Sequence, residues 1–172
     1  IYFWDENEGI AIGDPVNADL SKCYIIKTYD GGESWNVVND VPILNQSIGI
    51  MTWFDVYNDN MWYPIFTNDS TQNNIILFSD NRGESFQSIQ VPQDFKQQYF
   101  TSTWSDENNG FISNGYGLTS FTTNGGIDWS SPLQNIEFRI RYAKCAKQTQ
   151  ILYARHYNEI IRSDDWGASW YS

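Results

Sequence analysis

The side chains that could do chemistry in this chain are mainly carboxylates, which gather in polar stretches between apolar segments. Asp14, Asp55, Asp69 and Asp106 are available for a pair of the kind that hydrolyses glycosidic bonds by acid–base catalysis. The sequence does not show that any two of them face each other across a groove. Hydrolysis by paired carboxylates therefore stays one open interpretation.

The other polar clusters follow no recognisable metal-binding spacing. Asp14, Asn17 and Asp19 lie close together, as do residues 58–60, but neither cluster has the spacing of an EF-hand calcium loop. His156 is the single histidine and has no nearby cysteine, so we expect a solvated loop residue. We expect no metal, no cofactor and no catalytic residue within this segment.

The charge of the chain is strongly one-sided, with 21 acidic and 10 basic residues and a net charge of −11. This charge repels phosphate backbones, and the arginines and lysines form no cluster, so we expect no nucleic-acid partner. The acidic excess is typical of a surface that keeps an aromatic-rich chain in solution. No run of 18 apolar residues occurs, so we expect no membrane span.

An eight-residue pattern, Ser/Thr-x-Asp/Asn-x-Gly-x-Ser-Trp/Phe, occurs four times in the chain and indicates which elements position these polar stretches. The copies are residues 28–35, 79–86, 122–129 and 163–170, and their third residues lie 51, 43 and 41 positions apart. Intervals of this size are typical of one four-stranded blade of a β-propeller. The residues expected to be structural, at the third, fifth and eighth positions, are Asp30, Gly32, Trp35, Asn81, Gly83, Phe86, Asn124, Gly126, Trp129, Asp165, Gly167 and Trp170.

The residue types of this octapeptide predict a tight turn between two strands. The Asp or Asn side chain accepts hydrogen bonds from backbone N–H groups that follow it, and the glycine supplies a backbone angle that other residues resist. The final aromatic residue begins the next strand and fills the layer between neighbouring sheets. Asp128 replaces the usual hydroxyl residue in the third copy, so we expect that corner to be less regular.

These octapeptides resemble the Asp-box, also called the BNR repeat, of sialidases, sortilin-type receptors, xyloglucan hydrolases and proteins similar to the photosystem II assembly factor. The resemblance implies an Asp-box β-propeller with each box on the turn between the third and fourth strands of its blade. Because the boxes are structural in families with different activities, the resemblance implies no single function.

The chain as a whole is predicted to be all-β, because no stretch keeps a helical period. A weaker repeat of aromatic strand, polar turn, glycine and apolar strand at residues 3–13 and 103–113 supports this, and residues 53–62 form a third copy without the glycine. We expect one propeller segment of four four-stranded blades at residues 1–40, 41–91, 92–132 and 133–172. The outermost strand of the third blade is expected at residues 128–130.

The number of blades predicts that this segment belongs to a larger ring. Asp-box families generally close with six or more blades, so we expect part of a six- to eight-bladed ring; a closed four-bladed disc is the alternative. Cys23 is expected in the first blade and Cys145 in the fourth, at opposite ends of an open arc. We therefore expect no disulfide between them, and two thiols that act as small apolar fillers.

The favoured function is a non-catalytic scaffold that binds a protein or glycan partner. The loop style of residues 9–15 and 29–35 resembles secreted repeat proteins of Bacteroidetes-type bacteria with a C-terminal sorting domain, which implies type IX secretion and an extracellular or cell-surface location. The alternative is a sialidase-like or xyloglucanase-like glycoside hydrolase whose catalytic residues lie partly outside this segment. Phe138-Arg139-Ile140 echoes a sialidase motif, but Arg141 stands where that motif has proline.

Partner-binding residues are expected on the face opposite the octapeptide turns, because loops on a rigid scaffold are the usual sites of binding. The oligomeric state is not predicted by the sequence. The candidate binding residues are Asp14, Asn17, Asp69, Tyr116, His156 and Tyr157 on loops and Arg139 on an inner strand.

Overall fold

The regular elements of the described residues are almost all antiparallel strands. The structure, a computed structural model, describes residues 1–13, 24–42, 48–49, 53–67, 74–95, 99–134, 140 and 142–172. Within those residues the single helical element is a three-residue 3-10 turn, η1 (Gln93–Phe95). The chain is therefore all-β, as the sequence predicts.

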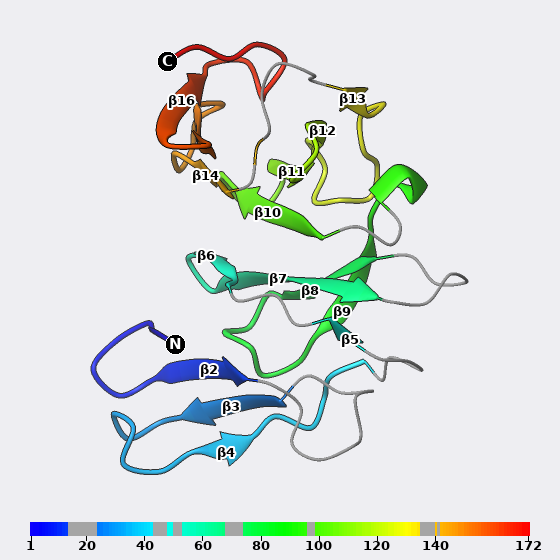
Figure 1. The fold of residues 1–172 in the computed structure, drawn as a ribbon. Helices are drawn as coiled ribbons and strands as arrows, with labels where there is room; N and C mark the ends of the chain where they lie inside the picture. Colours follow the sequence, from blue (N-terminus) through cyan, green and yellow to red (C-terminus); the bar gives the residue numbers. More distant parts are fainter. Residues whose placement is uncertain are drawn as a thin grey trace.

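The strands form four sheets that follow one another along the chain, and we name these sheets blades one to four. Figure 1 shows them side by side in an arc, from the blue N-terminal blade to the orange and red C-terminal blade. In blades one, three and four the strands pair in chain order as an antiparallel meander, and blade two follows the same pattern from β7 to β9. Blade one contains β1 (Tyr2–Phe3), β2 (Gly9–Gly13), β3 (Tyr24–Thr28) and β4 (Asn36–Val37); blade two contains β5 (Ile48–Gly49), β6 (Asp55–Tyr57), β7 (Asn60–Thr67), β8 (Ile75–Ser79) and β9 (Gln87–Gln90); blade three contains β10 (Phe100–Trp104), β11 (Gly110–Asn114), β12 (Leu118–Thr122) and β13 (Leu133–Gln134); blade four contains β14 (Tyr142–Cys145), β15 (Leu152–His156) and β16 (Glu159–Ser163).

Alternating burial along the strands fixes which face of a blade meets its neighbour. In β14, Ala143 and Cys145 are buried whereas Tyr142 and Lys144 are exposed, so one face of blade four packs and the other faces solvent. Every residue of β10 and β11 is buried, because blade three lies between blades two and four. The core is thus divided into layers between successive blades.

Large apolar side chains fill each of these layers. Ile10 and Ile25 of blade one pack against blade two, and Phe111 of blade three packs against blade four. Between blades two and three, the rings of Trp62 and Trp104 stack with their centroids 4.7 Å apart. Burial of each such side chain contributes about 1.5–3 kcal/mol, so these layers hold the blades together.

The predicted outermost strand of blade three, at residues 128–130, is wrong: the paired strand is β13, further along the chain. At the earlier position the Ser130 hydroxyl, not a backbone carbonyl, accepts the Phe121 N–H at 3.1 Å. Pro132 then follows and has no N–H to donate to a ladder. Regular pairing therefore resumes only at Leu133.

The inner strand of blade two and the outer strand of blade four also depart from a regular four-stranded blade. Both β5 and β6 pair with β7, so the inner position of blade two is taken by two short strands. In blade four the outer position is represented by a single bridge between Arg162 and Tyr171. The expected boundaries between blades and the expected single propeller segment stay predictions.

Cys145 lies buried on β14 as a free thiol, with its Sγ 3.6 Å from the carbonyl oxygen of Thr149. Burial raises the pKa of this thiol to about 12, which makes it a poor nucleophile at neutral pH. Cys23 lies outside the described residues, so the expected absence of a disulfide between Cys23 and Cys145 stays a prediction. In the part of the chain that the structure describes, no helix is long and apolar enough to cross a membrane.

Candidate functional site

The four octapeptide turns share one set of hydrogen bonds, which explains their repeated residue types. In the first copy, Thr28 Oγ1 accepts the Gly32 N–H at 2.8 Å and Asp30 Oδ1 accepts the Ser34 N–H at 2.9 Å. The other three copies repeat both bonds at the same positions. Hydrogen bonds from Ser34 and Thr28 hold the pKa of Asp30 at about 2, so its carboxylate stays charged and fixes the turn.

The third copy is as regular as the others, so the expectation that Asp128 loosens it is wrong. Where the third residue is Asp, as at Asp30, a serine hydroxyl at the seventh position donates to it. In the third copy the roles are reversed, and Asn124 Nδ2 donates to Asp128 Oδ2 at 3.0 Å. The donor and acceptor have exchanged positions while the bond between them is kept.

Each octapeptide turn is also bound to the turn that follows the first strand of its own blade. The N–H of the fourth residue donates to a carbonyl there, from Gly31 to Asn7 and from Gly125 to Asn108, at 2.9 and 2.8 Å. Equivalent bonds join Arg82 to Asp59 and Trp166 to Gln150. Both kinds of turn therefore lie at the same end of each blade, and we call this end the octapeptide rim.

The fifth-position glycines pack directly on the preceding blade, a contact that the local sequence does not indicate. A Cβ atom at Gly126 would lie 2.6 Å from Ile89 Cγ2, and one at Gly167 would lie 2.7 Å from Phe111 Cε2. Their φ angles of 85° and 82° also favour glycine. At Gly32 of blade one the nearest atoms lie 3.6 Å or more away. Glycine at this position thus serves the turn and, from blade two onward, the joint between blades.

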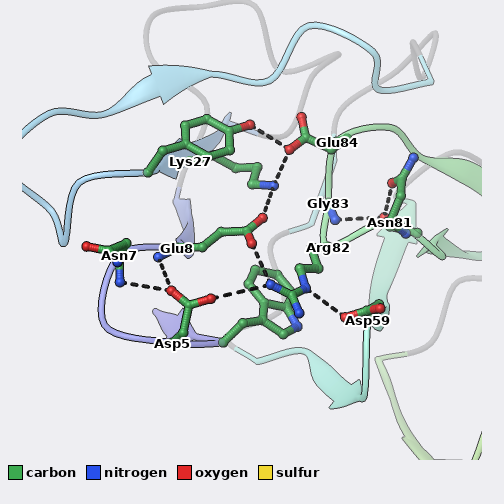
Figure 2. A network of polar contacts seen from close by, with 12 residues as sticks. Asp5, Asn7, Glu8, Lys27, Asp59, Asn81, Arg82, Gly83 and Glu84 are labelled. Atoms are coloured by element: carbon green, nitrogen blue, oxygen red, sulfur yellow. Dashed lines mark hydrogen bonds and ion pairs between the residues drawn. The ribbon is translucent and has the colours of Figure 1, made fainter.

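A network of charges on the octapeptide rim joins blades one and two. Figure 2 shows Glu8 between Lys27 and Arg82, and Lys27 between Glu8 and Glu84. Lys27 Nζ lies 2.9 Å from Glu8 and 2.6 Å from Glu84, although Lys27 is only 1% exposed. Burial opposes the charge on Lys27, but its hydrogen bonds to Glu84 and Glu8 outweigh burial and raise its pKa. Lys27 and Arg82 are both paired with carboxylates, so the network joins blades one and two structurally.

A pocket of about 400 Å³ opens where inner strands of blades one, two and four approach one another. We call it the central pocket. Its walls are apolar and aromatic, with the charged side chains of Asp55 and Lys144 at one side. Trp53 also contacts Tyr142 of blade four edge-on, with ring centroids 4.6 Å apart. The lining residues are Ile1, Tyr2, Trp53, Phe54, Asp55, Val56 and Lys144.

Asp55 is the buried charge of the central pocket and is held by residues from blades three and four. Its Oδ2 accepts from Thr103 Oγ1 at 2.7 Å and from the Trp104 N–H at 2.9 Å. Its Oδ1 lies 3.1 Å from Lys144 Nζ and 3.2 Å from Lys147 Nζ. Burial opposes the charged form, but the two lysines and these hydrogen bonds outweigh it, so the pKa of Asp55 lies below its usual value.

This arrangement suits binding better than acid–base catalysis. A general acid needs a raised pKa, and both oxygens of Asp55 are already occupied by donors. Among the described residues, Asp55 is the single carboxylate that lines this pocket. Two ammonium groups converge on this carboxylate, and the one that lines the pocket, that of Lys144, is the group available to an acidic ligand.

The structure describes three of the seven residues expected to bind a partner. Tyr116 is 70% exposed in the turn between β11 and β12, and Tyr157 is 61% exposed in the turn between β15 and β16. The ring of His156 contacts that of Tyr157 at a centroid distance of 4.6 Å. None of these three lines the central pocket. Asp14, Asn17, Asp69 and Arg139 lie outside the described residues.

Sequence reasoning missed Trp53, Lys144 and Lys147 as parts of a site. Asp55 was available as one of several carboxylates, but its partners lie 89 and 92 residues away in the chain. The repeated aromatic strand that contains Trp53 and Phe54 was the one signal present, and it indicated only a blade.

Comparison with solved structures identifies the architecture of these four sheets. A structure of YCF48 bound to a D1 peptide is 17% identical to this chain with a TM-score of 0.61, and the alignment covers 98% of this chain and 51% of that one. The GH74 xyloglucanase from Xanthomonas campestris is 14% identical with a TM-score of 0.61, over 97% of this chain and 28% of that one. The fold is that of a β-propeller.

These likenesses establish the fold and nothing finer. A GH74 enzyme from Niastella koreensis, 21% identical with a TM-score of 0.50, covers 86% of this chain and 22% of its own. The chain thus spans about half the length of the YCF48 chain and about a quarter of the xyloglucanase chain. A scan against protein-family models and a search of curated proteins both find no match. The neighbours include a protein captured with a peptide as well as hydrolases.

Proposed function

We propose that this chain is a non-catalytic binding β-propeller whose central pocket takes a segment of a partner protein. The observation that carries the proposal is the composition of that pocket, in which Trp53 and Phe54 lie beside the amine of Lys144. Aromatic walls bind an apolar side chain, and Lys144, with 62% of its side chain exposed, can pair with an acidic group. The expected ligand is an extended peptide with an apolar residue next to a carboxylate.

The likeness to YCF48 supports a peptide ligand, since that propeller is described with a D1 peptide bound. We also propose that the octapeptides are Asp-boxes with a structural role, because the side chains at their first and third positions bond within their own turns. An extracellular or cell-surface location remains part of the proposal. Protease treatment of intact source cells should remove the protein; protection until the cells are lysed would contradict this location.

The test of peptide binding is selection from a display library of random peptides, followed by calorimetry with the selected sequences. Trp53→Ala and Lys144→Gln should each weaken peptide binding by about tenfold or more, because the first removes an aromatic wall and the second removes the ammonium group that pairs with the peptide carboxylate. Tyr116→Ala is the matched control, since Tyr116 is exposed and lies outside the pocket. Equal weakening by all three variants, or by none, would contradict the central pocket as the site.

A glycoside hydrolase is the second candidate, because two of the similar structures are GH74 enzymes. The geometry of Asp55 weighs against it in this pocket, since its carboxylate is paired and its pKa is low. We expect no release of reducing sugar from xyloglucan and none of sialic acid from sialyllactose. Release by the unaltered chain that is abolished in Asp55→Asn would favour the hydrolase instead.

A further inference from the structure

A second pocket, of about 630 Å³, lies on the octapeptide rim between blades three and four. It is an open hollow bordered by the turn between β10 and β11, the turn between β14 and β15, and the octapeptide turn of blade four. Its volume falls within the range of roughly 300–1,000 Å³ typical of small-molecule sites. We call it the rim pocket, and nothing in the proposed function above depends on it.

The charged groups of the rim pocket already have ion-pair or hydrogen-bond partners. Arg162 pairs with Asp164 at 2.7 Å, and Tyr171 also donates to Asp164. Asp106 accepts the N–H groups of Asn108 and Asn109, both at 2.9 Å. An anionic ligand would meet two carboxylates against one guanidinium in a chain of net charge −11. A cationic ligand would have to displace these existing partners, so the lining favours a neutral ligand.

Uncharged polar groups remain to contact such a ligand. The side-chain amide of Gln150 makes no hydrogen bond within the described residues, and it lines the pocket. Gln148 donates through Nε2 to Tyr57 at 2.8 Å, which leaves its amide oxygen as an acceptor. The Thr149 hydroxyl already donates to the Ala146 carbonyl at 2.8 Å and accepts the Ile151 N–H at 3.1 Å, so the two glutamine amides are the main groups that remain. These groups match ligand hydroxyls, which both donate and accept hydrogen bonds.

Trp166 supplies an aromatic ring at a position where the backbone disfavours it. It is the fourth residue of its octapeptide and has a φ of 56°, whereas the first and third copies have Gly31 and Gly125 there. Bulky residues rarely adopt this conformation, so the local turn does not account for tryptophan. The Trp166 ring packs on Phe121, with centroids 6.4 Å apart, and lines the rim pocket.

We propose that the rim pocket binds a neutral oligosaccharide. The C–H face of a pyranose ring packs on an aromatic ring such as Trp166, while its hydroxyls bond with the amides of Gln148 and Gln150. This site lies on the rim that carries the octapeptides, opposite the face where the sequence placed binding. It is independent of the central pocket, so peptide binding there can fail without affecting it.

The test titrates the whole chain with cellotriose, xylotriose, mannotriose and chitotriose as neutral probes and with trigalacturonate as an anionic one. At least one neutral probe should bind. Trp166→Gly should weaken that binding by about tenfold or more, and Trp166→Phe should restore most of it by replacing the ring. Ile127→Ala is the control, because it removes an exposed apolar side chain from another octapeptide turn, outside the rim pocket.

The melting temperature separates this proposal from a purely structural role of the tryptophan. Because Gly relieves the positive φ, Trp166→Gly should melt near the unaltered protein while losing the saccharide. Gln150→Ala, at an exposed amide, provides a second loss-of-binding variant if Trp166→Gly melts early. The proposal is overturned if no neutral probe binds, if trigalacturonate binds more tightly, or if neither variant weakens binding.

Discussion

Replacing Asn124 by Asp should destabilise the third octapeptide through repulsion between two carboxylates. Asn124 Nδ2 and Asp128 Oδ2 lie 3.0 Å apart, so the new carboxylate would face an existing one at that distance. At the dielectric of water the repulsion is about 1.4 kcal/mol, and the lost hydrogen bond adds about 1 kcal/mol. We expect a total near 2 kcal/mol, which lowers the melting temperature of a chain of this size by about 4–8 °C.

The neighbouring repeats supply the controls for this experiment. Asn81→Asp makes the same change beside Ser85, whose hydroxyl can donate to a carboxylate, and should cost little. The double variant Asn124→Asp with Asp128→Ser recreates the Asp and Ser pair of the first copy and should recover most of the loss.

Acidity provides a further check on the same variant. Adjacent carboxylates resist ionising together, so the variant takes up protons more readily when folded, and its deficit relative to the unaltered protein should shrink as the pH falls towards about 4. Calorimetric melting at pH 7 and pH 4 measures both effects. If Asn124→Asp and Asn81→Asp melt at the same temperature, the exchange of donor and acceptor does not stabilise the turn.

Three further predictions concern stability. Gly126→Ala should lower the melting temperature more than Gly32→Ala, because both residues have a positive φ but only a methyl group at Gly126 would clash with the preceding blade. Equal losses would contradict the role of Gly126 in the joint between blades. Lys27→Met should cost about 2 kcal/mol in chemical denaturation, since it removes two charge-assisted hydrogen bonds from a buried ammonium group to Glu8 and Glu84, whereas Lys144→Met, at an exposed side chain, should cost less than about 1 kcal/mol. The pKa of Asp30 is lowered to about 2, so the stability that its carboxylate contributes is present above pH 4 and is lost as the pH falls towards 2. Asp30→Asn should therefore lose less stability than the unaltered protein over that range. A parallel loss in both proteins would contradict the role of the Asp30 carboxylate in the turn.

The four octapeptides made the fold predictable from the sequence because their stabilising bonds are local. Asp30 and Thr28 bond to backbone groups within four residues, so the same residue types at the same spacing produce the same turn in every copy. Their spacing then identified the blades. The outermost strand of blade three was misplaced because Ser130 and Pro132 disturb its pairing, and the octapeptide pattern does not extend that far.

The central pocket and the rim pocket both depend on contacts between residues far apart in the chain, which no local sequence pattern predicts. Asp55 meets Lys144 and Lys147 only when the inner strands of blades two, three and four converge. Trp166 meets Phe121 only when blade four packs on blade three. A turn is fixed by a few adjacent residues through short-range hydrogen bonds, so the sequence by itself determined the repeated blades. Packing of one blade on the next involves residues far apart in the chain, so only the tertiary structure decided which charges and rings share a pocket.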